Sequence, residues 1–347
     1  MEEVTVGVVA NPASGRDIRR LVSGASVFDN AEKGSMVRRL MAGLGAAGVG
    51  RVLLMPAGDG LGASVHRGLR ANRSTRLPAL EELEMPLDGS WRDSERATLA
   101  MAERGVRAIV VLGGDGTHRV VSRACGDVPL CALSTGTNNC FPEVREATVA
   151  GLATGLVATG RVDGPVLRRA KLLLVERPGH EPDRALVDVA VTTARFTGAR
   201  ALWRPQDARE VVVTFAPAGA VGLSAVAGML DPVPRDAPHG LHVRLADPAT
   251  AERVVAVPLA PGLVEPVGVA AVRRLAPGEA VDVAPGGGSL ALDGEREIEL
   301  HASETVRVRL SDRGPLTIDV DEAMAQAAAA RLLEGTVASE RGEAWPR

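Results

Sequence analysis

The stretch "VVLGGDGTHRVVSRACGDVPLCALSTGTNN", residues 110–139, decides the fold class of this chain. It contains two short apolar runs, and each passes directly into a segment rich in Gly or in hydroxyl and amide side chains. Continuous apolar runs of strand length are typical of parallel strands that are buried on both faces. Since ligands of such sheets bind at the carboxyl ends of the strands, the two segments predict a phosphate-binding site there.

Outward from this stretch, the first 160 residues alternate apolar runs with helix-like segments. Strands are expected at residues 4–10, 51–55, 107–112 and 129–134, and helices at residues 35–47, 92–104 and 143–159. This alternation predicts an α/β fold with a doubly wound, mostly parallel sheet covered by helices on both faces. We expect residues 1–160 to form this nucleotide-binding domain.

Beyond residue 160 the pattern changes to strand-length runs, several with period-two alternation, separated by turns rich in Pro, Gly and Asp. It predicts a second, β-rich domain over residues 161–317. An Ala-rich segment within residues 318–337 predicts a C-terminal helix. Because a helix at the end of a β-rich domain has little to pack on, we expect it to return to the first domain.

The composition excludes several classes of protein. The net charge of the 347-residue chain is −3, and aromatic residues make up 2% with no Tyr, so a nucleic-acid partner is not expected. The three cysteines lack the spacing of a zinc site or a disulfide framework. With no basic, apolar start and no apolar run near ~18 residues, we expect no membrane partner and a cytoplasmic protein.

The first candidate motif is Gly113-Gly114-Asp115-Gly116-Thr117. Glycines after a buried strand let a ligand approach the backbone, and the start of the next helix offers N–H groups to an anion. A carboxylate among phosphates repels them unless it meets Mg²⁺ or takes a proton from an attacking hydroxyl. The alternative is a plain Asp-Gly turn. His118 is expected to be a solvated residue of the helix start, with a phosphate contact as the alternative.

Two further segments end strands in a similar way. The second loop contributes Gly136, Thr137, Asn138 and Asn139, whose hydroxyl and amide groups suit phosphate, ribose or base, and its alternative is a helix cap. Asn11 begins "NPASG" after the first strand, where a Pro/Gly turn is the alternative. We expect these residues to join the first motif in one nucleotide site.

With these residues in place, the chain resembles the ATP-dependent NAD kinase superfamily, which includes the diacylglycerol and sphingosine kinases. "LGGDGT" is the shared signature, while "NPASG" and "STGTNNCFPE" are similar to lipid-kinase loops. "ALVDVAV" (185–191), "APAGAVGLSAVAG" (216–228) and "LALDGERE" (290–297) are similar to segments of the family's β-rich domain. Within the superfamily the chain most resembles the NAD kinase-like proteins associated with acetoin catabolism.

The resemblance implies roles for single residues. Asp115 would be the base on the acceptor hydroxyl, and Asp188 and Gly219 would bind the acceptor. The family's Asn-Glu pair reads Val187-Asp188 here, and its Thr-Gly-Ser-Thr-Ala-Tyr segment has lost every hydroxyl over residues 218–223. Each lost partner of a buried ligand group costs about 1–3 kcal/mol of binding free energy. The acceptor pocket therefore differs from that of NAD kinases.

The resemblance also implies the reaction. We expect transfer of the γ-phosphoryl group of ATP to the 2′-hydroxyl of NAD. Mg²⁺ would be carried by the nucleotide, and no metal would be bound by protein ligands alone. The alternatives are a kinase of the same superfamily acting on a lipid or small-molecule hydroxyl, and a catalytically silent nucleotide-binding regulatory protein. A homodimer or homotetramer assembled through the β-rich domain is expected from the family.

Overall fold

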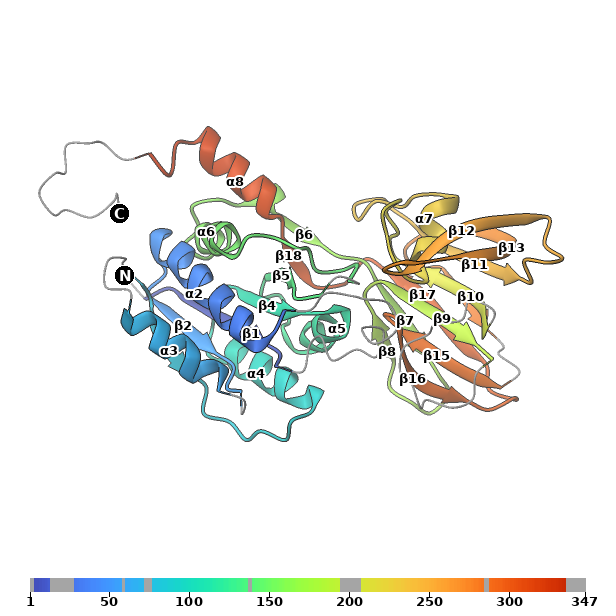
Figure 1. The fold of residues 1–347 in the computed structure, drawn as a ribbon, viewed down its shortest axis with the longest axis horizontal. Helices are drawn as coiled ribbons and strands as arrows, with labels where there is room; N and C mark the ends of the chain where they lie inside the picture. The colour runs from blue at the N-terminus through green and yellow to red at the C-terminus, as the bar shows by residue number, and fades with distance from the viewer. Residues whose placement is uncertain are drawn as a thin grey trace, which may run out of the picture.

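The chain builds one parallel sheet with helices on both faces and two antiparallel sheets (Figure 1). This computed structural model describes residues 3–12, 28–57, 60–71, 77–136, 139–193, 207–283 and 287–334. In Figure 1 the helix-covered sheet lies on the left and the antiparallel sheets lie on the right. The predicted fold class, a parallel-sheet domain followed by a β-rich part, is confirmed.

The first sheet has the strand order β3-β2-β1-β4-β5-β18-β6. Pairing from β3 to β18 is parallel, and β6 pairs with β18 in the antiparallel sense. The order reverses at β1, which lies between β2 and β4, and such a switch point is where open α/β sheets bind ligands. The strands are β1 (Thr5–Ala10), β2 (Arg51–Leu54), β3 (Ala79–Glu82), β4 (Ile109–Gly113), β5 (Leu130–Ser134), β6 (Leu167–Arg169) and β18 (Leu316–Ile318).

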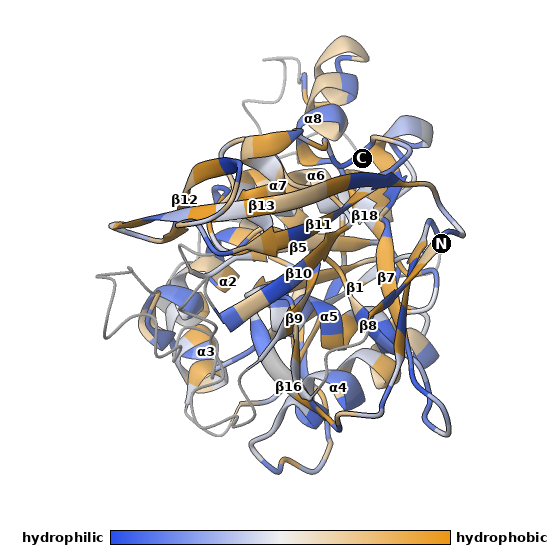
Figure 2. Cartoon of the chain, turned by 90° about the vertical axis from the view of Figure 1, so that its right-hand side faces the viewer, coloured by the Kyte–Doolittle hydropathy of each residue, from blue (hydrophilic) through white to orange (hydrophobic). Residues whose placement is uncertain are grey.

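Alternate residues of the central strands enter two separate cores. Val110 and Leu112 of β4 pack into the core on one face of the sheet, and Ile109 and Val111 pack into the core on the other. The first core is covered by α2 (Asn30–Ala46), α3 (Leu61–Ala71), α6 (Ala147–Ala158) and α8 (Val320–Ala329), and the second by α4 (Trp91–Glu103) and α5 (Asp115–Ala124). Figure 2 shows hydrophilic and hydrophobic patches along α3 and α4, as expected of helices with one buried face.

Helices α2 and α6 approach each other closely because glycines face the neighbouring backbone. A Cβ on Gly43 would overlap the carbonyl oxygen of Thr148, and a Cβ on Gly151 would overlap that of Leu40. The contact holds the two helices together on one face of the sheet. No helix in the described ranges is both long enough and apolar enough to cross a membrane.

The β-rich part contains two antiparallel sheets, ordered β12-β13-β11-β10-β9-β15-β16 and β14-β17-β7-β8. Side chains of both sheets share one core, and α7 (Ser224–Leu230) with Phe141 packs into a second core on the seven-stranded sheet. The strands are β7 (Leu172–Glu176), β8 (Asp183–Ala185), β9 (Asp188–Thr192), β10 (Ala208–Val213), β11 (Gly240–Ala246), β12 (Arg253–Ala260), β13 (Leu263–Leu275), β14 (Ala280–Val283), β15 (Gly288–Leu292), β16 (Glu295–Leu300) and β17 (Val306–Ser311).

The chain returns to the first sheet after β17. β18 pairs with β5 and β6, and α8 packs beside α6. α8 ends at Ala329, which is earlier than the predicted span of residues 318–337, and residues beyond 334 lie outside the described part. The division at residue 160 stays a prediction. It assigns β6, and β18 up to residue 317, to the second domain, whereas the hydrogen bonds of both strands place them in the first sheet. Strands of three residues are too short for their sequence pattern to show which sheet they join.

Candidate active site

Asp115 stands at the point where β4 turns into α5. Gly113 is the last residue of β4, Gly114 is the N-cap of α5, and Asp115 is already the first residue of the helix. The strand therefore passes into the helix through a single residue. The N–H groups of a first helical turn have no carbonyl partner within the helix, so this turn has the anion-binding property that was inferred for the helix start.

The three glycines of this motif have different neighbours. A Cβ on Gly113 would lie 2.5 Å from Cβ of Thr117, and a Cβ on Gly114 would lie 2.9 Å from Oδ1 of Asn139. Packing against Thr117 therefore requires glycine at position 113, whereas a side chain at position 114 would displace the terminal amide of Asn139. At Gly116 the nearest atom to a Cβ would be Oε1 of Glu295, 3.5 Å away, which is an ordinary contact. Among the described residues, none makes a contact that requires glycine there, and the position leaves room for an approaching ligand.

The carboxylate of Asp115 accepts backbone hydrogen bonds from the second loop. The N–H of Phe141 donates to Oδ1 over 2.7 Å, and the N–H of Cys140 lies 3.1 Å from Oδ1 and 3.0 Å from Oδ2. The side chain is 9% exposed. The two predicted motifs thus meet at Asp115, although through the backbone of residues 140–141 rather than through the polar side chains that suggested the second loop.

The second loop is held together by its own polar groups. Nδ2 of Asn139 donates to Oγ of Ser134 over 2.8 Å, and Oγ of Ser134 donates to the carbonyl oxygen of Gly136 over 2.7 Å. Asn139 also faces Gly114, so it connects the loop to the strand-helix turn. Thr137 and Asn138, which were predicted to bind the nucleotide, lie outside the described residues.

Asn11 lies at the end of β1, beside the same turn. Its Nδ2 donates to Oγ1 of Thr117 over 2.9 Å. Lys33 of α2 is 1% exposed and directs its ammonium group at the backbone of this strand end, with Nζ 2.9 Å from the carbonyl oxygen of Asn11 and 3.4 Å from that of Pro12. The structure therefore brings Asn11, Thr117 and a buried cation together at the switch point of the sheet.

Helix α5 connects this turn to the β-rich part through a buried ion pair. Nε of Arg119 lies 3.3 Å from Oδ2 of Asp293, and the two side chains are 4% and 0% exposed. Asp293 begins the turn between β15 and β16 and accepts the N–H groups of Leu186 and Val187 at 2.9 and 2.8 Å. Burial raises the pKa of the Asp293 carboxyl to about 7, although the Arg119 guanidinium and the N–H donors act in the opposite direction.

The two predicted acceptor-binding residues occupy different surroundings. Asp188 is the first residue of β9, 5% exposed, and its carbonyl oxygen accepts the N–H of Asp293 over 2.9 Å. Gly219 lies in an exposed turn, where no described residue has an atom within 4 Å of an added Cβ. Asp188 is therefore connected to the Asp293 turn, whereas the Gly219 turn is open on the side where a Cβ would lie.

His118 is buried rather than solvated, and the expectation of an exposed helix-start residue is wrong. Its side chain is fully buried, its ring centroid lies 5.7 Å from that of Phe141, and Nδ1 lies 2.8 Å from the carbonyl oxygen of Gly114. Because a carbonyl can only accept, Nδ1 carries the proton in this contact. Burial lowers the pKa of His118 to about 4. The neutral ring is therefore hydrogen-bonded to the backbone of the turn.

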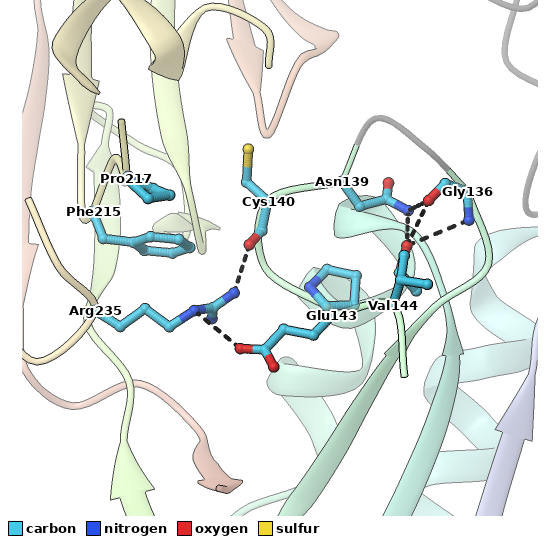
Figure 3. A pocket seen from close by; sticks show the side chains of 10 residues that line it. Gly136, Asn139, Cys140, Glu143, Val144, Phe215, Pro217 and Arg235 are labelled. Atoms are coloured by element: carbon cyan, nitrogen blue, oxygen red, sulfur yellow. Dashed lines mark hydrogen bonds and ion pairs between the residues drawn. The ribbon is translucent and has the colours of Figure 1, made fainter. Parts of the chain in front are cut away.

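A cavity of about 420 Å³ lies between the second loop and the β-rich part. Its lining residues are Ser134, Gly136, Asn139, Cys140, Pro142, Glu143, Val144, Phe215, Pro217 and Arg235 (Figure 3). Arg235 lies with its Cζ 4.4 Å from the ring centroid of Phe215 and donates from Nη2 to the carbonyl oxygens of Cys140 and Phe141. The volume lies within the usual range of small-molecule sites.

Several residues of the site were missed by sequence reasoning. Arg235 lies in the Pro-rich segment "DPVPRDAPHG", which has no periodicity, and Arg119 and Asp293 lie 174 positions apart. One compositional signal was available for Lys33. The chain has only two lysines, Lys33 and Lys171, and both are buried with their Nζ atoms on backbone carbonyls. Within the described ranges no group of three or more His, Cys, Asp or Glu residues is arranged to hold a metal ion.

Comparison with known proteins agrees with this architecture. Residues 6–162 match the ATP-NAD kinase N-terminal domain, and residues 171–313 match the acetoin catabolism protein X C-terminal domain. Acetoin catabolism protein X of Cupriavidus necator is 44% identical over 335 residues, which cover 94% of this chain and 93% of that protein. The crystal structure of a diacylglycerol kinase from Bacillus anthracis aligns over 92% of this chain and 97% of its own with 12% identity and a TM-score of 0.44. The chain belongs to the family of acetoin catabolism protein X, within the ATP-NAD kinase superfamily.

Proposed function

We propose that this protein transfers the γ-phosphoryl group of ATP to a hydroxyl group and that the preferred acceptor is the 2′-hydroxyl of NAD. The observation that carries the proposal is the turn at Asp115, where a buried carboxylate stands in the first turn of a helix beside Gly116, a glycine that no contact with another described residue requires. A helix start favours phosphate, and a carboxylate there suits a hydroxyl that must lose a proton.

Each residue of the turn has a role in this proposal. The N–H groups of Gly116 and Thr117 would bind the donor phosphates, with Gly113 and Gly114 keeping the turn close to them. Asn11 would hold Thr117 in place through the 2.9 Å hydrogen bond. Mg²⁺ bound to the phosphate oxygens would neutralise charge that builds up during transfer. Gly136, Thr137, Asn138 and Asn139 would complete the nucleotide site from the second loop.

Asp115 would accept the proton of the attacking hydroxyl. Its carboxylate accepts the N–H groups of Cys140 and Phe141. The hydrogen bonds with these two N–H groups orient the carboxylate, and such preorganisation is what phosphoryl transfer needs most from a protein. Asp188 and Gly219 would contact the acceptor.

A different acceptor is the second candidate, and it rests on the chemistry of residues 216–223. This segment offers no hydroxyl group, and its Gly219 turn is exposed. A lipid or small-molecule hydroxyl in the cavity beside Phe215 and Pro217 would need fewer polar partners than NAD. A third candidate, a silent nucleotide-binding regulator, is supported by the N–H groups that the Asp115 carboxylate already accepts.

An acceptor panel separates the three candidates. Transfer of γ-labelled phosphate from ATP–Mg²⁺ is measured with NAD, with diacylglycerol in mixed micelles and with short diols, and ATP binding is measured by calorimetry. Labelled phosphate on NAD alone would support the proposal. Labelled phosphate on another hydroxyl alone would support the second candidate, a kinase with a different acceptor. ATP binding without transfer to any acceptor would leave the regulatory role, and no ATP binding would contradict all three.

We further propose a homodimer or homotetramer assembled through the β-rich part. The β12–β13 hairpin exposes Val254, Val264 and Val272, which are 45%, 63% and 37% accessible. Apolar side chains exposed on an edge strand and its neighbour favour association. Light scattering after gel filtration should give at least twice the 36.0 kDa mass of one chain, and a monomer at all concentrations would contradict this assembly.

A further inference from the structure

One peptide group lies between the Asp115 carboxylate and the Arg235 guanidinium. It joins Cys140 to Phe141: its N–H donates to Oδ1 of Asp115 over 2.7 Å, and its carbonyl oxygen accepts from Nη2 of Arg235 over 2.6 Å. Figure 3 shows Arg235 reaching this carbonyl from the side of the β-rich part. An anion and a cation are therefore connected through a single, polarisable amide.

Arg235 is held in this position by aromatic rings beside its guanidinium and by hydrogen bonds to the segment that carries it. Its Cζ lies 4.4 Å from the ring centroid of Phe215 and 5.5 Å from that of Phe141. The segment that carries it is anchored by Lys171, whose Nζ donates to the carbonyl oxygens of Ala237 and His239 over 2.7 and 2.6 Å. Although the Arg235 side chain is 40% exposed, its donor end is therefore fixed on the loop.

We propose that Arg235 is a positioning residue that holds and polarises the Cys140–Phe141 peptide, and so couples the β-rich part to the orientation of Asp115. A hydrogen bond accepted by a carbonyl strengthens the donor at the other end of the same amide, because the bonds along such a chain polarise one another. The bond between Phe141 and Asp115 is therefore stronger while Arg235 is in place. The coupling itself is independent of the proposed function, and only its effect on catalysis rests on that function.

The geometry also explains why arginine occupies this position. Nη2 reaches two successive carbonyl oxygens, those of Cys140 and Phe141, while the plane of the guanidinium covers the Phe215 ring. A lysine ammonium can also donate to backbone carbonyls, but it is a compact charge with no planar group to stack on the ring. Arg235→Lys should therefore restore only part of what Arg235→Gln loses.

The test uses the scarcity of phenylalanine. The chain has four Phe residues, so selective ¹⁵N-Phe labelling gives four backbone amide signals, and loss of one signal in Phe141→Leu assigns Phe141. In wild type we expect its amide proton far downfield, because it binds a carboxylate over 2.7 Å. Arg235→Gln should move this signal upfield, and Arg235→Lys should move it part of the way.

Arg274→Gln is the matched control. Arg274 forms an ion pair with Asp231, at the start of the segment that carries Arg235, so this variant loses the same charge nearby without touching the loop. An unshifted Phe141 signal in Arg235→Gln, or an equal shift in Arg274→Gln, would overturn the proposal. Should Arg235→Gln not fold, Phe215→Leu removes the ring beneath the guanidinium and should move the Phe141 signal in the same direction, and no movement would likewise overturn it.

Activity separates this proposal from the proposed function. If the protein is a kinase, Arg235→Gln should lower kcat by about tenfold or more while the Kd for ATP stays within about twofold, since one weakened orienting hydrogen bond is worth roughly a factor of ten. A shifted Phe141 signal in a protein without transferase activity would leave the coupling standing and remove the proposed function. Wild-type activity with kcat unchanged in Arg235→Gln would contradict the catalytic role of the coupling.

Discussion

Breaking the ion pair between Arg119 and Asp293 should destabilise the protein strongly, because both side chains are almost fully buried. Two unit charges about 4 Å apart attract by roughly 4 kcal/mol at an effective dielectric constant near 20. Arg119→Met removes the cation and leaves a buried carboxylate with the N–H groups of Leu186 and Val187. Leaving one buried charge uncompensated typically costs about 3–5 kcal/mol. Because the pKa of Asp293 is already raised and the carboxyl can take up a proton once Arg119 is gone, we expect a loss at the lower end of this range, near 3 kcal/mol in the free energy of unfolding.

The reverse change should cost a similar amount. Asp293→Asn keeps an oxygen that can accept the N–H groups but places an amide beside the Arg119 guanidinium. In the double variant neither charge remains, so its loss should be roughly 3 kcal/mol rather than the sum of about 6 kcal/mol. The double-mutant cycle should therefore give a coupling energy near 3 kcal/mol.

Urea unfolding, followed by far-ultraviolet circular dichroism and by Trp fluorescence, measures these free energies where the two probes give coincident transitions. A surface control is Arg39→Met, since the Arg39 side chain is 45% exposed beside Glu32, and this variant should change stability by less than about 1 kcal/mol. A loss below about 1 kcal/mol for both single variants, or additivity within about 0.5 kcal/mol, would refute the reasoning.

Two further predictions concern the strand-helix turn. Gly113→Ala places a methyl group 2.5 Å from Cβ of Thr117 and should lower the free energy of unfolding in urea by about 1–3 kcal/mol. Gly116→Ala should keep the free energy of unfolding within about 1 kcal/mol of wild type and weaken ATP binding in calorimetry. Equal stability of the two variants would contradict the packing argument. Burial lowers the pKa of His118 from 6.5 to about 4, so its stabilising contribution is complete above pH 6.5 and disappears as the pH falls through 4. Lowering the pKa of His118 from 6.5 to about 4 corresponds to about 3 kcal/mol. Between pH 6.5 and 4 the free energy of unfolding should therefore fall by about 3 kcal/mol more in wild type than in His118→Leu. Parallel pH profiles of the two proteins would refute the assignment.

Much of the first sheet could be predicted because its strands are continuous apolar runs with helices between them. The run before Gly113 became β4, and the run before the second loop became β5, with both motifs at the carboxyl ends as expected. β3 was missed, since "ALEE" carries two acidic residues at the edge of the sheet. The short strand β6 was missed because its pairing with β18 depends on contacts between distant parts of the chain.

For the site, residue type and spacing identified what lies along one segment but not what crosses between segments. The proximity of Asn11 to Thr117 followed from strand ends that meet at one edge of the sheet. The role of residues 140–141 did not follow, because backbone N–H groups leave no trace in the sequence. Arg235 was invisible for a related reason: its partners are two carbonyl oxygens and an aromatic ring that only the fold brings near.

The central claim is that Asp115 serves phosphoryl transfer to NAD, and NADP formation from ATP–Mg²⁺ and NAD measures it most directly. Wild type should form NADP, and Asp115→Asn should lose at least about 100-fold in kcat, the contribution typical of a positioned proton acceptor. Asp127→Asn is the matched control, since the Asp127 side chain is 83% exposed, and it should retain full activity. Equal NADP formation by wild type and a folded Asp115→Asn variant would contradict this account, as would a wild type that binds ATP and NAD yet forms no NADP.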